Sequence, residues 1–160
     1  MGKSKRIGLL LSVLTGAVIL FSSVQKNGQS TEMAENQEEI EAIRATVQLY
    51  VDGITFSNTD KLDAAFHEEW HMTGFFEDGV YQRFDRERFI SMIGSNTQRT
   101  VENPAFEGGI VDVYHYGKTA VVKVRVENER VIFTDHLSLL KINGEWTIVH
   151  KIWDTELQNS

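Results

Sequence analysis

The stretch FTDHLSLLKINGEWTIVHKIW, residues 133–153, decides the fold of this chain. Apolar and polar residues alternate in much of its two halves, and a period of two residues is typical of β-strands. Between the halves lies Asn143-Gly144, a pair that favours the two-residue turn of a β-hairpin because both residues tolerate a positive φ. We therefore predict two long antiparallel strands, at 131–142 and 146–154.

The same period of two continues upstream of this hairpin. It predicts strands at 110–116 and 120–127, joined by the turn residues Gly117-Lys118. In the second of them the valines alternate with Lys123 and Arg125, as in a half-buried strand. The C-terminal half is thus predicted to be a four-stranded antiparallel meander.

The N-terminal half has a helical period. Apolar residues at i, i+3, i+4 and i+7 predict an amphipathic helix over 36–57. Asn58 and Asp85 are suitable N-caps for two shorter helices, and a short hairpin over 70–84 separates these. The resulting order, ααββαββββ, predicts an α+β fold in which three helices pack on a curved, mainly antiparallel sheet.

Three helices can cover only one face of such a sheet, yet the last two strands carry apolar residues on both faces. We therefore predict a homodimer formed through the sheet. Strict alternation in the last strand places Trp146, Ile148 and Ile152 on one face of the sheet. Lys151 and Trp153 then point to the other face, which we assign to the dimer interface.

The first thirty residues have the pattern of an export signal. Lys3, Lys5 and Arg6 precede an apolar run over 7–21, which is shorter than the ~20 residues that span a bilayer. We predict that 1–30 is an export signal or N-terminal anchor with a short linker, and that 31–160 is one exported domain, periplasmic or secreted. Because no good cleavage site follows the run, the alternative is an uncleaved segment that anchors the domain to the outer face of the inner membrane. This anchor is the only membrane contact that we expect.

Charge and cysteine usage exclude several functions. All 23 acidic residues follow residue 30, so the predicted domain is strongly acidic and lacks the basic surface that nucleic acids require. The chain has no cysteine, which excludes disulfides, thiol catalysis and thiolate metal sites. We expect no cofactor.

The order of the elements resembles the nuclear transport factor 2-like superfamily. Residues 133–153 look like its subfamily of putative lumazine-binding proteins, in which a Thr-Asp pair, a Leu-rich strand, an Asn/Asp-Gly turn and a Trp-x-Ile strand ending in Lys recur. Here these are Thr134-Asp135, Asn143-Gly144, Trp146-Thr147-Ile148 and Lys151, and the likeness extends over 38–154. The resemblance implies a cone-shaped roll with a small-ligand pocket between the long helix and the concave sheet face. The resemblance brings no catalytic motif with it. Some members of the superfamily isomerise or dehydrate small ring compounds, and others only bind them.

Several side chains could line that pocket. Asp135 shares a strand face with Phe133 and Leu137, and we assign that face to the cavity. The expected ligand contacts are Tyr50, Trp70, His71, Phe133, Asp135 and Leu137. Tyr50, His71 and Asp135 are also candidate catalytic residues, because a histidine and a carboxylate in an apolar pocket can do acid–base work on a carbonyl compound. For each of them the alternative is a core residue satisfied by hydrogen bonds.

One further motif, His67-Glu68-Glu69-Trp70-His71, matches the zinc-binding pattern H-E-x-x-H. In a helix, His67 and His71 would share one face and could bind zinc. The residues Trp70 to Thr73 favour a strand, however, in which the two imidazoles do not converge. A metal site at His67 and His71 is therefore a remote alternative, and we expect no metal.

The sequence thus predicts an exported, pocket-forming domain that binds a small, largely apolar ligand. An acid–base enzyme of the isomerase or dehydratase type is the alternative. A third possibility is an interaction module whose pocket is filled by its own side chains.

Overall fold

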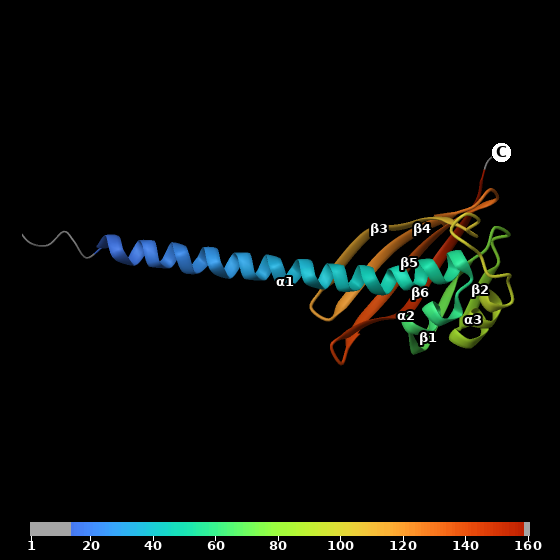
Figure 1. Ribbon diagram of the computed structural model, residues 1–160, viewed down its shortest axis with the longest axis horizontal. Helices are drawn as coiled ribbons and strands as arrows, with labels where there is room; N and C mark the ends of the chain where they lie inside the picture. Colours follow the sequence, from blue (N-terminus) through green and yellow to red (C-terminus); the bar gives the residue numbers. More distant parts are fainter. Residues whose placement is uncertain (1–13, 159–160) are drawn as a thin grey trace, which may run out of the picture. The chain divides into compact units, whose positions relative to one another are not determined.

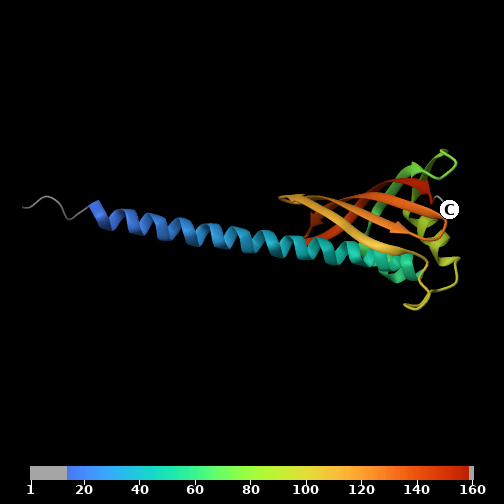
Figure 2. The same ribbon diagram turned by 90° about the horizontal axis from the view of Figure 1, so that it is seen from above.

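The computed structural model describes residues 14–158 (Figures 1 and 2). The chain divides into two compact units, Met1–Glu38 and Glu39–Ser160, and helix α1, Leu14–Phe56, runs through the boundary between them. In the first unit the described residues are helical. Lys3, Lys5, Arg6 and the start of the apolar run, on which the predicted export signal depends, lie outside the described residues. No helix among residues 14–158 is long and apolar enough to cross a membrane.

The second unit combines the C-terminal part of α1 with two short helices and a six-stranded sheet. After α1 the elements are α2 (Thr59–Ala65), β1 (Phe66–Phe75), β2 (Tyr81–Asp85), α3 (Arg86–Gly94), β3 (Glu107–Tyr116), β4 (Thr119–Glu127), β5 (Val131–Ile142) and β6 (Glu145–Leu157). The sheet order is β2-β1-β6-β5-β4-β3, and its pairs are antiparallel except β1 with β6. The predicted α+β fold and its ααββαββββ order are confirmed.

Capping side chains explain where the two short helices, α2 and α3, begin. The side chain of Asn58 accepts a hydrogen bond from the backbone N–H of Lys61 at 3.1 Å, and Asp85 accepts one from Arg88 at 2.9 Å. Each cap satisfies an N–H that would otherwise have no partner in the first helical turn. From Glu39 onward, α1 runs along one face of the sheet (Figure 1). Its apolar stripe, which includes Ile43, Val47, Tyr50 and Ile54, belongs to the same buried core as the inward residues of the strands.

Strand β6 contains a bulge that the sequence does not reveal. Ser138 of β5 pairs with His150, whereas the next residue, Leu139, pairs with Ile148. Val149 therefore has no partner on β5. An extra residue of this kind interrupts the alternation of side chains between the two faces.

After the bulge, each side chain of β6 points to the opposite side of the sheet from the one that strict alternation predicts. Lys151 and Trp153 are buried on the side of the sheet that α1 covers, and Ile152 is 49% exposed on the other side. The prediction that Lys151 and Trp153 lie at the outer face is therefore wrong. It assumed an unbroken ladder, in which Ile148 and Lys151 could not share a face.

The parallel pairing of β1 with β6 brings Gly74 opposite Trp153. A Cβ atom at Gly74 would overlap the carbonyl oxygen and the indole ring of Trp153, so the two strands can approach this closely only with glycine at 74.

We expect Gly74→Ala to destabilise the protein by about 1–3 kcal/mol, because the added methyl group forces Trp153 or the strand to move. Gly109→Ala is the matched control, since a Cβ there has no neighbour within 4 Å. It should change stability by less than about 0.5 kcal/mol. Urea unfolding measures the free energy of unfolding of both variants. Equal losses of stability would show that the close approach of the two strands does not require glycine at 74.

Candidate functional site

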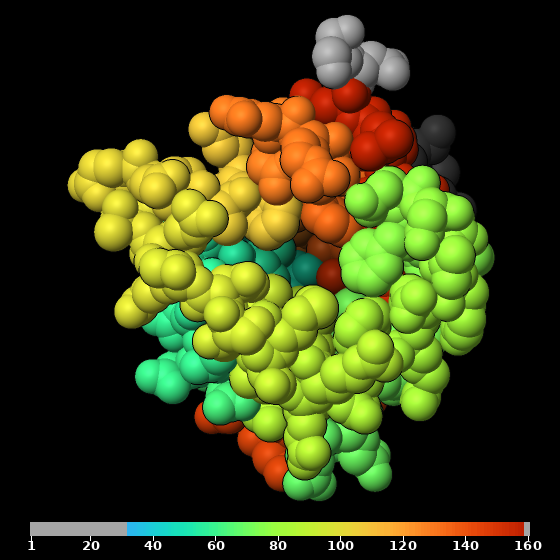
Figure 3. Space-filling view, turned by 90° about the vertical axis from the view of Figure 1, so that its right-hand side faces the viewer, coloured from blue at the N-terminus to red at the C-terminus, as the bar shows by residue number. Residues whose placement is uncertain are grey.

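A cavity of about 100 Å³ lies between α1, α3 and the sheet. Its lining is Tyr50, Ile54, Met72, Phe76, Phe89, Met92, Ile93, Phe106, Val126, Phe133, Asp135, Lys151 and Trp153. Figure 3 looks into the hollow, which is ringed by the β1–β2 loop, α3, the segment after it and the β4–β5 turn. Phe76, Phe106 and Phe133 also line a neighbouring groove of about 480 Å³, so the cavity adjoins a second, more polar space.

Three polar residues interrupt the apolar lining. Tyr50, Asp135 and Lys151 come from α1, β5 and β6, and their exposed fractions are 1%, 1% and 5%. Tyr50 belongs to the inward face of α1, Asp135 to the inward face of β5, and Lys151 is turned inward by the bulge at Val149. We call these three residues the Tyr50–Asp135–Lys151 cluster.

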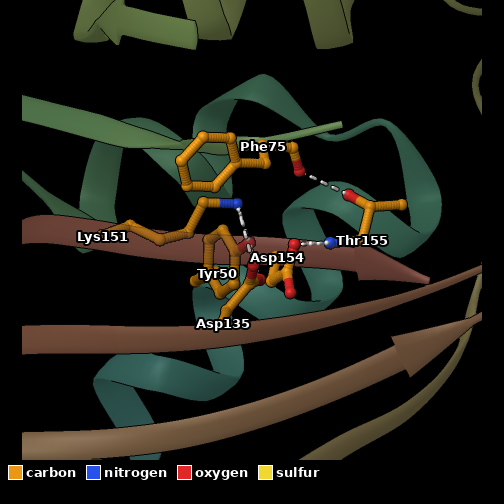
Figure 4. Close-up of polar contacts among 6 residues, drawn as sticks. All are labelled: Tyr50, Phe75, Asp135, Lys151, Asp154 and Thr155. Carbon is orange, nitrogen blue, oxygen red and sulfur yellow. Dashed lines mark hydrogen bonds and ion pairs between the residues drawn. The ribbon is translucent and has the colours of Figure 1, made fainter. Parts of the chain in front are cut away.

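The cluster forms a closed triangle of polar contacts (Figure 4). The Tyr50 hydroxyl donates to Asp135 Oδ2 at 2.5 Å, and Lys151 Nζ donates to Tyr50 Oη at 2.9 Å. Lys151 Nζ is also 3.2 Å from Asp135 Oδ1, as an ion pair. The geometry at Oδ1 does not complete a hydrogen bond, so this buried oxygen can still accept one.

Burial controls the protonation of the cluster. Loss of solvation lowers the pKa of Lys151, and the Asp135 carboxylate offsets this only in part. Burial and then the charge of Asp135 raise the pKa of Tyr50 well above its ordinary value of 10.0. Lys151 Nζ also lies 5.4 Å from the ring centroids of Tyr50, Phe89 and Trp153, within the range of cation–π attraction.

The structure brings together only part of the predicted site. Tyr50, Phe133 and Asp135 line the cavity. Trp70 lies in the core, where its ring stacks on Phe66 with the centroids 4.1 Å apart. Leu137 is likewise buried in the core and is not part of the lining.

His71 lies on the other face of the sheet. Its neighbour Met72 lines the cavity, and adjacent strand residues point to opposite faces. The His71 ring is 4.5 Å from that of His150, centroid to centroid, away from Asp135. The expected histidine–carboxylate pair is therefore not formed by His71 in this structure.

Lys151 is the polar residue that sequence reasoning missed. Its one signal was a charged side chain within the apolar strand Ile148 to Trp153. Alternation assigned it to the wrong face, because the bulge depends on how β5 and β6 pair.

The H-E-x-x-H motif lies in strand β1, where no helical face exists to align its histidines. His67 Nδ1 instead accepts a hydrogen bond from the Glu69 backbone N–H at 3.2 Å. Within residues 14–158 no group of three His, Asp or Glu side chains is arranged to hold a metal ion.

The fold and the position of the cavity define a protein of the nuclear transport factor 2-like class. A protein of this class from Silicibacter pomeroyi, of unknown function, is 26% identical, with a TM-score of 0.67 over 76% of this chain and 98% of that one. One from Shewanella baltica is 22% identical, with a TM-score of 0.66 over 74% and 94% of the two chains.

Residues 38–154 match the model of the family described as "Putative lumazine-binding", and this chain belongs to that family. Among curated proteins, "Aldolase FrzH" from Cladobotryum sp is 26% identical over 117 residues, which cover 72% of this chain and 90% of that protein.

The cluster makes a prediction about pH and stability. Tyr50→Phe should destabilise the protein by about 1–3 kcal/mol at pH 8, because it leaves the buried Asp135 without its hydroxyl donor. The raised pKa of Tyr50 means that its contribution is complete below pH 10.0 and is lost as the pH rises further. The difference between wild type and variant should then shrink by about 1.4 kcal/mol per pH unit.

Urea unfolding between pH 8 and pH 11 measures this difference. Tyr114→Phe is the control, because Tyr114 is 70% exposed and its loss should change stability by less than about 0.5 kcal/mol. A difference for Tyr50→Phe that stays constant up to pH 11 would mean that Tyr50 is not held protonated by its surroundings.

Proposed function

We propose that this domain binds a small, largely apolar molecule that carries a polar oxygen. The observation that carries the proposal is the position of the Tyr50–Asp135–Lys151 cluster in an otherwise apolar cavity. Pockets of this composition, with few polar groups in a mainly apolar lining, are typical of small-molecule sites. The family's description points to small-molecule binding as well.

The size of the cavity limits what can enter it. About 100 Å³ is less than the ~150 Å³ of an apolar cavity known to hold a benzene ring. A six-membered ring would therefore enter the cavity only in part, and the rest of the ligand would extend past Phe76, Phe106 and Phe133 into the groove. Arg130, Glu77 and Asp78 line that groove and suit a polar tail.

The cluster would orient the ligand. The Lys151 ammonium has donors beyond the one given to Tyr50, and a ligand oxygen could accept from them. Asp135 Oδ1 could accept from a ligand hydroxyl. A purely apolar ligand would use neither group, so we expect the protein to prefer an oxygen-bearing ring over the corresponding hydrocarbon.

A variant that fills the mouth of the cavity tests this proposal. Met92 lines the cavity and is 37% exposed, so Met92→Trp should block entry without disturbing the core. We expect wild type to bind cyclohexanol and the variant to bind it at least about tenfold more weakly, a loss of about 1.4 kcal/mol.

Ligand-observed NMR of the full chain measures the binding. Val101→Trp is the matched control, because Val101 is 78% exposed and does not line the cavity. Equal binding by both variants, or no binding by wild type, would contradict the proposal. Native mass spectrometry of the protein taken from its source would then identify any ligand that co-purifies.

The second candidate is acid–base catalysis on a carbonyl compound. Its support is the direct hydrogen bond between Tyr50 and Asp135 inside the cavity, together with a relative that is named an aldolase. Asp135 would remove a proton next to the carbonyl group, and Tyr50 or Lys151 would stabilise the developing enolate oxygen.

Exchange of the α-protons of cyclohexanone with D₂O, followed by NMR, tests this chemistry. Wild type should accelerate the exchange, and Asp135→Asn should reduce the acceleration by about 10²–10⁴-fold, which is the usual contribution of a general base. The same rate with Asp135→Asn as with wild type would exclude Asp135 as the base.

Export and dimerisation stay proposals. Export rests on the sequence of residues 1–30, and N-terminal sequencing of the protein from its source tests it. Dimerisation through the sheet is supported by Val121, Leu140 and Ile152, apolar residues of β4, β5 and β6 that are exposed. Sedimentation velocity measures the oligomeric state directly.

A further inference from the structure

We propose that the Lys151 amine forms a reversible imine with the carbonyl carbon of an aldehyde or ketone bound in the cavity. The inference rests on the proposed binding function and deepens it, because it names the class of ligand and the atom that reacts.

The surroundings of Lys151 differ from those of two other lysines in the described part of the chain that form ion pairs, Lys61 and Lys141. Lys61 pairs with Asp52 and Lys141 with Glu39, and all four of these side chains remain at least 24% exposed. The side chain of Lys151 is 6% exposed and that of its partner Asp135 is 1% exposed. Nζ faces a cavity that an organic molecule could enter, and the surrounding rings of Tyr50, Phe89 and Trp153 limit access of water.

Stability does not explain why a lysine occupies this place. A buried ion pair contributes little, since the loss of hydration of both ions offsets their attraction, and an apolar pair of similar volume is often as stable or more so. A lysine at the inner wall of an apolar cavity is therefore better explained by a reaction of its amine with a bound ligand than by a contribution to stability.

The same surroundings favour the reactive form of the amine. A protonated lysine has no lone pair and cannot attack a carbonyl carbon, whereas burial lowers the pKa of Lys151 and so favours the neutral amine. Each unit by which an amine pKa falls toward the ambient pH increases its neutral fraction about tenfold. Asp135 Oδ1, 3.2 Å from Nζ, is placed to accept the proton that the ammonium must lose.

The reaction balances with these groups alone. The Lys151 ammonium gives one proton to the Asp135 carboxylate, and the neutral amine then attacks the carbonyl carbon. The carbonyl π-bond breaks as the C–N bond forms. The oxygen takes up two protons, one returned through Asp135 and one from the attacking nitrogen, and leaves as water while the nitrogen lone pair forms the C=N bond. The product is an iminium cation beside the Asp135 carboxylate, so the net charge of the site does not change. Tyr50, which bonds to both partners, would hold the carboxylate in place.

Reductive trapping tests the inference. The full chain is incubated at pH 7.4 with cyclohexanone and sodium cyanoborohydride, which reduces an iminium to a stable secondary amine, and adducts are located by peptide mass mapping. We expect adduct at Lys151 at least about tenfold above that at any other lysine, because its amine faces the ligand in the cavity and burial favours its neutral form. Even labelling of all lysines would overturn the inference.

Variants at Lys151 and at an exposed lysine complete the trapping test. Lys151→Met should abolish the dominant adduct, and Lys123→Met, at an exposed lysine of β4, should leave it unchanged. If Lys151→Met does not fold because Asp135 is left unpaired, the triple variant Lys151→Met, Asp135→Leu and Tyr50→Phe removes the whole cluster, leaves none of its polar groups buried without a partner, and should be folded and free of that adduct. An equally abundant adduct on another residue of either folded variant would overturn the inference.

Binding is measured in parallel with cyclohexanol and cyclohexanone by ligand-observed NMR. Binding of both without an adduct at Lys151 would overturn the imine and leave the proposed binding function intact. No binding of either compound would overturn both proposals.

Discussion

The bulge at Val149 in β6 is the constraint on which the cavity depends. Without it, Ile148 and Lys151 would lie on opposite faces of the sheet, and the amine would point away from α1. With it, β6 contributes Ile148 to the core and, three and five residues later, Lys151 and Trp153 to the cavity. A local irregularity in one ladder thus decides which side chains the protein can present to a ligand, as bulges next to functional sites commonly do.

The polar cluster is stable only as a whole. Tyr50, Asp135 and Lys151 are almost completely buried, and each supplies the partner that another needs. Removing one member leaves a buried donor, acceptor or charge unpaired, which is much more unfavourable than replacing a pair by apolar groups. A ligand that hydrogen-bonds to the cluster would meet groups already held in place by α1, β5 and β6, so that little ordering would accompany its binding.

The first and last parts of the domain illustrate how far the sequence could predict the structure. The caps Asn58 and Asp85, the apolar period of α1 and the turn at Asn143-Gly144 are local signals, and the elements that they predict are present. Tyr50 and Asp135 could be assigned to the cavity because each lies on a regular helix or strand whose inward face is clear from its apolar neighbours. His71 and Lys151 could not be assigned, because both lie beside irregularities in the pairing of β1, β5 and β6.

By itself, the sequence determined the order of the elements, the α+β class, the family and two members of the cluster. Period, capping and turn chemistry act between residues that are close in the chain, and so they can be read from it. Only the tertiary structure decided that Lys151 completes the cluster and that His71 does not. That choice depends on the register between strands, which is set by packing across the whole sheet and leaves no periodic mark in the sequence.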